Sequence, residues 1–312
     1  MQRMMNLILF ELKKLLNNKK AFLFLLVLNI TPIIASIVLL LVYITCKGFG
    51  FGEIQFSGMK KTIQFLFTTH FTLFGYIAPF FLALLVGDSF ATEFGRGYMK
   101  MLLITPVRRW QVITAKTVAV ITFLIIAVLL GGIILQTDLL VARAVTQTSG
   151  LPLPSPLQPK SIDNSLAMVS VSSAFQLLTL AFVSNLMLIG FFIFASMFFE
   201  SAILMSFNSL GMVMGIQVFY MLSAVLKTLF SGMPSGTSIK SLIAIIDFIG
   251  QKFCFTRYYI DIFSPENIRK VLDGSITIWQ GNVSHSLLYC FLWSVIFYGI
   301  ATFVFSRKQV LH

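Results

Sequence analysis

Long apolar runs alternate with short polar segments along most of the chain. Six of these runs reach about 20 residues, the length that a helix needs to cross about 30 Å of hydrocarbon. They cover residues 21–45, 65–86, 112–135, 171–199, 202–230 and 286–305. Because lipid offers the backbone no hydrogen-bond partners, each run is expected to be helical. The pattern predicts an all-α integral membrane protein with six transmembrane helices in one domain, residues 1–312.

The first 20 residues follow a helical period with two different faces. One arc is apolar, formed by Met4, Met5, Ile8, Leu12, Leu15 and Leu16. Polar side chains lie opposite, at Arg3, Asn6, Lys13, Asn17 and Lys20. This pattern predicts an amphipathic helix lying in the headgroup plane. A signal peptide is the alternative, but the run that follows is longer than its apolar region of about 7–15 residues.

Two longer segments, residues 137–170 and 231–284, separate the later spans. The Pro-rich stretch Leu151–Pro159 favours an extended chain. Residues 239–250 are apolar but too few to span, so we expect a re-entrant or interfacial piece. A short outer helix is predicted to follow, with Ser264 as its N-cap, Pro265 in its first turn and Gly274 as its stop. Its apolar residues Ile268, Val271 and Leu272 form one face, so we expect the helix to rest on the membrane.

The positions of the basic residues predict how the chain is oriented in the membrane. The sequence is 57% hydrophobic, 11% charged, and carries a net charge of +12. Its basic residues flank apolar spans, which favours lipid headgroups over nucleic acid as their counterpart. Twelve of the 23 lie in or beside segments that would be cytoplasmic with the N-terminus inside: Arg3, Lys13, Lys14, Lys19, Lys20, Arg96, Lys100, Arg108, Arg109, Lys116, Arg307 and Lys308. Both termini are therefore expected in the cytoplasm, and residues 231–284 outside.

The segment 87–111, with the lysine that follows it, has the most specific pattern. Its order is an acid, a glycine four residues on, two leucines, a Pro-Val-Arg-Arg turn and a lysine opening the next span, at Glu93, Gly97, Leu102, Leu103, Pro106, Arg108, Arg109 and Lys116. The pattern resembles the signature of type 2 ATP-binding cassette (ABC) transporter permeases. That family also opens with an interfacial helix bearing an acid, matched here by Glu11 beside Lys13 and Lys14. Tyr98 departs from it, since a small hydroxyl residue is commoner there.

The same segment has a physical interpretation as a lever. Gly95 and Gly97 weaken the helix after the second span and permit a bend at the membrane surface. Pro106 stops the short helix that follows. A partner that pushes on this helix would tilt both attached spans. The alternative is a basic loop that only sets topology.

The resemblance implies the membrane subunit of an ABC exporter in a plasma (inner) membrane of a prokaryote. It implies two cytoplasmic ATPase subunits and a second permease subunit, identical or related. The chain has no Gly-Lys dipeptide and so no phosphate-binding loop of the Gly-x-x-x-x-Gly-Lys kind. No cofactor is therefore expected in this chain, and ATP and Mg are expected on the partner ATPase. The substrate is not readable, although a Phe- and Met-rich pathway would suit amphiphiles.

The resemblance also implies roles for particular residues. Coupling to the ATPase is expected at Glu93, Gly97, Tyr98, Lys100, Pro106, Arg108, Arg109 and, as a second contact, Glu200. For Glu200 a plain anchor of the hairpin is an equal alternative. The second and fifth spans supply the pathway candidates Phe71, Phe74, Asn208 and Met212. A small-x-x-x-small face at Gly211 and Gly215 is the candidate dimer interface.

Other classes of function have less support. The histidines have no metal-ligand spacing, so no metal site is predicted. Cys46 and Cys254 fall on the same predicted outer side, and a disulfide between them is left open. An ion- or proton-coupled carrier would need ionisable residues at mid-membrane depth, and the spans hold almost none. A lipid-modifying enzyme would need a catalytic cluster, and the sequence shows none.

Overall fold

The computed structural model describes residues 2–27, 29–30, 33–34, 37, 41, 55–95, 109–148, 171–229, 242, 244–246, 248 and 254–307. This part of the chain forms helices and contains no strand, which confirms the all-α prediction. The helices are α1 (Gln2–Leu16), α3 (Gln55–Ser89), α4 (Ala91–Gly95), α6 (Arg109–Thr148), α8 (Val171–Ser196), α9 (Ala202–Leu229), α11 (Phe255–Phe263), α12 (Pro265–Leu272) and α13 (Gly281–Arg307).

Five described stretches are long and apolar enough to cross a membrane: Phe67–Glu93, Trp110–Ile134, Ser172–Ser196, Ala202–Phe219 and Gly281–Arg307. They coincide with five of the six predicted spans. The first predicted span, residues 21–45, and the apolar segment 239–250 lie only in part within the described residues. The sixth crossing therefore stays a prediction.

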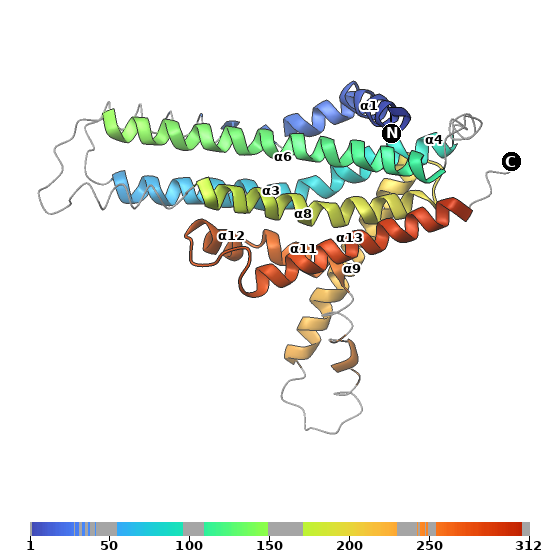
Figure 1. Cartoon of the computed structure of the whole chain (residues 1–312). Coiled ribbons are helices and arrows are strands. Elements are labelled where there is room, and N and C mark those ends of the chain that lie inside the picture. The colour runs from blue at the N-terminus through green and yellow to red at the C-terminus, as the bar shows by residue number, and fades with distance from the viewer. Residues whose placement is uncertain are drawn as a thin grey trace, which may run out of the picture.

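The second and third predicted spans are parts of longer helices. At about 1.5 Å per residue, the 35 residues of α3 and the 40 of α6 extend roughly 50 and 60 Å. Both exceed the roughly 30 Å of hydrocarbon in a bilayer. Figure 1 shows both helices running along the length of the bundle, and each packs on α8. The continuation of α6 to Thr148 puts helix where the sequence predicted an outer segment.

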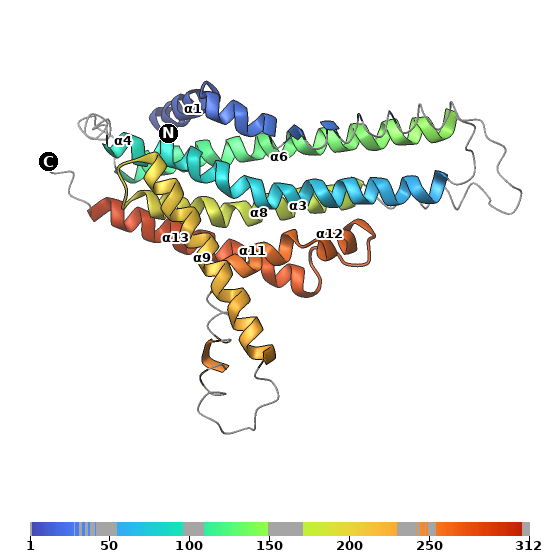
Figure 2. The ribbon, with the colours of Figure 1, turned by 180° about the vertical axis from the view of Figure 1, so that it is seen from behind.

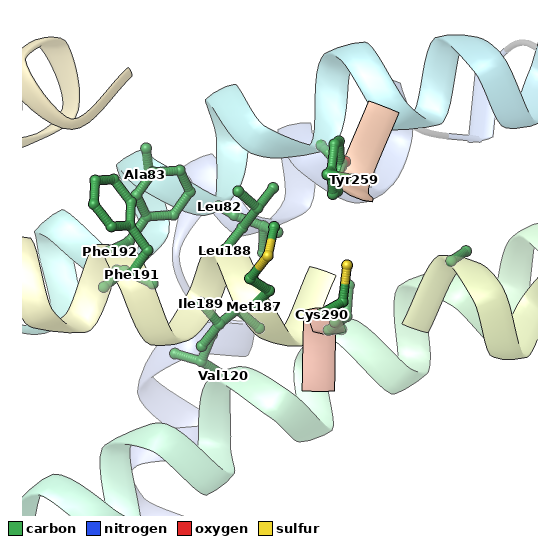
Figure 3. Packing of buried hydrophobic residues seen from close by; sticks show 14 of the residues in the cluster. Leu82, Ala83, Val120, Met187, Leu188, Ile189, Phe191, Phe192, Tyr259 and Cys290 are labelled. Carbon is green, nitrogen blue, oxygen red and sulfur yellow. The ribbon is translucent and has the colours of Figure 1, made fainter. Parts of the chain in front are cut away.

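The core of the bundle is built around α8. Of its spanning stretch, 67% is buried inside the protein, against 22% for the stretch in α13. Helix α8 contacts α3, α6 and α13, which surround it. Figure 3 shows part of this packing, with Phe192 and Leu188 of α8 close to Leu82 of α3. Side chains on all sides make α8 the centre of the fold.

Small residues let other helices approach closely. A Cβ added at Gly190 of α8 would lie 3.0 Å from the Ser294 carbonyl oxygen of α13. A Cβ added at Gly87 would lie 3.0 Å from the Ala202 carbonyl oxygen, where α3 meets the start of α9. Ser206 of α9 donates a hydrogen bond to the Ala83 carbonyl of α3 at 3.1 Å. The contacts at Gly87 and Ser206 fix α9 to α3 at one end of the bundle.

Two ends of the bundle are distinct in both views. The first residues of α1, helix α4, the α8–α9 turn and the last residues of α13 lie together, and we call this the α4 end (Figures 1 and 2). Helices α11 and α12 lie toward the opposite end, the α12 end. Segments predicted to share one side of the membrane thus meet at one end of the molecule.

The short outer helix forms as the sequence predicts, but its apolar face is covered by protein. The Ser264 hydroxyl caps α12 by accepting from the Asn267 amide at 3.3 Å, and Gly274 ends the segment with φ of 69°. Ile268, Val271 and Leu272 are buried, and α12 packs on α3 and α8. The prediction that this helix rests on the membrane is wrong in this respect, because α3 and α8 extend far enough to cover it.

Helix α9 leaves the bundle after its first turns. Its second half stands apart from the other labelled helices in both views (Figures 1 and 2). Large apolar side chains along it are exposed, among them Phe207, Met212, Met214, Val218 and Leu222. Lipid or another protein surface has to cover them in the membrane.

Candidate functional site

Helices α1, α4 and α6 meet around a single lysine at the α4 end. The Lys116 side chain is fully buried in the second turn of α6. Its Nζ lies 2.8 Å from Glu11 Oε1, to which it donates a hydrogen bond, and 2.6 Å from Glu93 Oε2. Glu11 and Glu93 are themselves only 4% and 5% exposed. One ammonium group therefore connects α1, α4 and α6.

A second lysine completes the group. Lys14 of α1 donates to Glu93 Oε1 and is half exposed. Glu11, Lys14, Glu93 and Lys116, which we call the Lys116 cluster, hold two carboxylates and two ammonium groups, so the formal charges balance. A buried charge without a partner is very costly, whereas a paired one is tolerated. This balance explains how four ionisable side chains lie together beside apolar spans.

A more exposed pair lies next to the cluster. Lys20 Nζ is 2.7 Å from Asp88 Oδ2 near the end of α3. Asn18 donates to the same carboxylate at 3.5 Å. The chain just after α1 is therefore tied to α3, while α1 itself is tied to α4 and α6. Asp88 therefore has a structural role.

The helix of the second predicted span is broken before the two glycines are reached. Helix α3 ends at Ser89 and α4 covers Ala91–Gly95, so this break falls at Phe90. The residues after Gly95 lie outside the described residues, and a bend at Gly97 stays a prediction. Phe90 is fully buried, and Lys116 Nζ lies 6.0 Å from its ring centroid. A buried aromatic anchor at the break turns the following carboxylate, Glu93, toward Lys116.

The face that α1 presents to the protein differs from its predicted apolar arc. Glu11 and Leu15 are buried, whereas Met5 and Leu16 of that arc are exposed. Lys13, the third residue expected to matter in this helix, is also exposed. The ion pair between Glu11 and Lys116 decides which side faces α6.

The structure brings part of the predicted coupling set together. Glu93 meets Lys14 and Lys116, and the exposed Glu200 occupies the α8–α9 turn at the same end. Arg109 is the first residue of α6. The remaining predicted coupling residues lie outside the described residues: Gly97, Tyr98, Lys100, Pro106 and Arg108.

The pathway candidates divide by helix. Phe71 and Phe74 of α3 are buried, and the Phe74 ring packs 6.2 Å from that of Phe263 of α11. Asn208 and Met212 of α9 are exposed, and Asn208 donates to the Leu204 carbonyl within its own helix. The structure thus separates these candidates into a buried pair and an exposed pair.

The candidate dimer residues lie on the open side of α9. A Cβ added at Gly211 or Gly215 would meet nothing within 4 Å.

The cysteines and the possible metal ligands form no site in the part of the chain that the structure describes. Cys254 and Cys290 are buried free thiols, and Cys46 lies outside the described residues. Within the described residues, no group of His, Cys, Asp and Glu side chains is arranged to hold a metal ion.

From the sequence alone, Lys116 was recognised only as a member of the motif, and its partners were not predicted. Its pairing with Glu11 joins residues 105 positions apart, and its pairing with Glu93 brings two motif members into contact. A lysine inside an apolar helix was the available signal, because a buried lysine needs an acid nearby.

A comparison with known families gives a match over the region that contains the predicted coupling segment. Residues 59–151 match the model of a family described as ABC-2 family transporter protein. No curated protein matches the chain significantly. The matched region contains α4 and the first 40 residues from Arg109 onward, with Glu93 and Lys116 inside it. The resemblance to ABC transporter permeases is confirmed over this region, in a multi-pass membrane protein.

Proposed function

We propose that this chain is the membrane subunit of an ABC exporter that works with a separate ATPase. The observation that carries the proposal is the Lys116 cluster, because it joins the matched coupling segment to two further elements. ATP and Mg would bind to the ATPase subunits. What this chain contributes is a rigid connection between their docking surface and the spans.

The cluster suggests how a push would travel. Movement of the segment after Glu93 would carry α4, and α4 is held to α6 through Lys116 and to α1 through Lys14 and Glu11. Separating a buried pair would leave carboxylates without partners, which is costly. The three helices would therefore move together, so that the third span tilts instead of the loop bending.

A dimer of permease subunits, identical or related, is the second part of the proposal. The open face at Gly211 and Gly215 lets another helix approach closely, and exposed Phe207, Met214 and Val218 lie on the same helix. A Gly215→Cys variant should crosslink two copies, or this copy and its partner, in the active complex. If the opposite face of α9 crosslinks instead, the interface lies elsewhere.

The orientation is proposed from the basic residues. Both termini and the α4 end would face the cytoplasm, in a plasma (inner) membrane. A cysteine placed at Lys160 should react with an impermeant reagent added from outside. Reaction only after permeabilisation would reverse the orientation.

The test of the whole proposal is coupling to an ATPase. Purification in mild detergent should bring down a soluble ABC ATPase, and substrate transport should depend on its ATP hydrolysis. Glu93→Gln should lower stimulation of that ATPase about tenfold or more while the complex still assembles. Glu266→Gln, which changes an exposed carboxylate of α12 at the opposite end, is the matched control and should leave stimulation unchanged. Transport that follows an ion gradient without any ATPase would favour a coupled carrier instead.

A further inference from the structure

The loop between α12 and α13, residues 273–280, carries the most exposed large apolar side chain among the described residues. Trp279 is 78% exposed, whereas Ile278 before it is buried. Single exposed apolar side chains are common on protein surfaces, so the exposure alone assigns no role. The backbone that holds this ring and the level at which it lies give it one.

The backbone of this loop is ordered by its own hydrogen bonds. Gly274 and Gly281 bound it with φ of 69° and 65°, a conformation that favours glycine. The amides of Ser275 and Ile276 both donate to the Lys270 carbonyl of α12, at 3.0 and 3.2 Å. The indole therefore projects from ordered backbone, so little conformational entropy is lost when a partner covers it.

A second exposed ring lies at the same level of the bundle. The Ile278 amide donates to Gln176 Oε1 of α8 at 3.3 Å, which joins the loop to the first turns of that helix. Phe175, next to Gln176, is 69% exposed. Phe175 and Trp279 thus flank one hydrogen bond, near the end of the bundle where α8 begins and packs against α12 (Figure 1).

Both rings lie where apolar stretches begin. The stretch of α8 that could cross a membrane starts at Ser172, and that of α13 starts at Gly281. Phe175 is three residues inside the first start, and Trp279 is two residues before the second. Two separate helices therefore put an exposed aromatic ring at the boundary of a span.

The exposed surface of α13 changes from polar to apolar just beyond this level. Asn282 and His285 are the exposed polar side chains of its first turns. Leu288 and Phe291 follow and are more than half exposed. This order is expected where a helix passes from lipid headgroups into hydrocarbon. Tryptophan is enriched at that level, because its ring is apolar and its N–H needs a polar partner.

We propose that Trp279 and Phe175 anchor the α12 end in the phospholipid interface, between headgroups and hydrocarbon. The indole N–H would donate to a phosphate or ester oxygen, and both rings would lie against the upper part of the acyl chains. The sequence predicted this contact for the apolar face of α12, but protein covers that face. The anchor would set the depth at which α8 and α13 enter the membrane. It depends on membrane insertion and not on coupling to an ATPase.

Tryptophan fluorescence of the full-length protein in phosphatidylcholine nanodiscs tests the proposal. The chain has three tryptophans, so Trp110→Phe with Trp293→Phe leaves only Trp279. Acyl chains brominated near the headgroup should quench its emission about twofold more than chains brominated near the methyl end. Iodide added in the water should quench it little.

Two further variants give a depth scale in a chain without native tryptophans. Phe175→Trp should show the same order of quenching as Trp279. Leu288→Trp is the matched control, because it is an exposed position of α13 about 10 Å beyond Gly281. It should be quenched more by the deeper bromine. If the multiple variants do not fold, the emission lost from the otherwise unsubstituted protein in Trp279→Phe gives the same comparison.

Three results would overturn the proposal. Strong quenching by iodide with none by brominated lipid would put Trp279 in water. Protection from both would mean that a protein surface, such as a second copy, covers the ring. Stronger quenching by the deeper bromine would put it in the hydrocarbon. The assay contains no ATPase, so these results and those of the coupling experiment are independent.

Discussion

At the α4 end three helices meet around the ammonium group of Lys116, whereas at the α12 end α11 sits on α3 through neutral groups. The first contact is made by oppositely charged side chains that pair with one another. The second is made by the Tyr259 hydroxyl, by rings such as Phe74 and Phe263, and by the absence of a side chain at Gly75. Both are buried, but they differ in what a single substitution leaves behind.

This difference has a consequence for movement. Ion pairs buried between helices keep one set of partners, because separation leaves a bare charge in apolar surroundings. Aromatic and small-residue packing loses less when helices slide. We therefore expect the α4 end to move as one body, and the helices of the α12 end to shift against one another more easily.

The largest effect is expected from Lys116→Met. It removes the cation and leaves Glu11 and Glu93 buried, each 5% exposed or less, with Lys14 as the remaining cation of the Lys116 cluster. Breaking a buried pair in this way costs about 3–5 kcal/mol. Thermal unfolding of the purified protein should show the loss, and Lys14→Met should cost clearly less because Lys14 is half exposed.

A triple variant sharpens this prediction. Glu11→Gln, Glu93→Gln and Lys116→Met together remove all three charges at the centre, so much of the stability should return. Coupling to the ATPase should stay lost if the ion pairs transmit movement. A stable triple variant with normal coupling would reduce the cluster to a packing feature.

The sequence predicted local features at both ends better than their meeting points. The cap at Ser264, the stop at Gly274 and the five described spans follow from short-range signals and were confirmed. The partners of Lys116 and the cover over α12 depend on residues far apart in the chain. No local pattern shows which distant helix supplies a carboxylate, or whether protein or lipid covers an apolar face.

Gly75→Ala should have the next largest effect. A Cβ at this position would lie 2.7 Å from Phe263 Cβ, and the stem of that side chain has little freedom to yield. Overpacking of this kind costs about 1–3 kcal/mol. Proteolysis or hydrogen exchange should show α11 loosened while α1 stays protected. Equal loosening at both ends would mean that they are not independent.

Tyr259→Phe should have a smaller effect. Burial raises the pKa of Tyr259 well above its ordinary value, so the hydroxyl stays protonated and donates to Gly75. Its removal leaves that carbonyl without a donor, because Pro79 four residues later has no N–H, at a cost of about 1–2 kcal/mol. Unfolding temperatures should fall by less than in Gly75→Ala, because the ring still packs. A larger fall than in Gly75→Ala would place the hydroxyl, rather than the close approach of Phe263, at the centre of this contact.

Lys20→Ala should have the smallest effect and shows why burial, rather than charge alone, separates the two ends. The Lys20–Asp88 pair lies beside the Lys116 cluster and has a similar N–O distance of 2.7 Å, but Lys20 is half exposed. Exposed pairs contribute about 0–1 kcal/mol, and salt screens them. The unfolding temperature should therefore change little, and the difference from the unsubstituted protein should shrink further at high salt. Lys116→Met should show no such salt dependence, because its partners are shielded from water. If Lys20→Ala proved as damaging as Lys116→Met, the number of charges near the membrane surface, and not their burial, would hold the α4 end together.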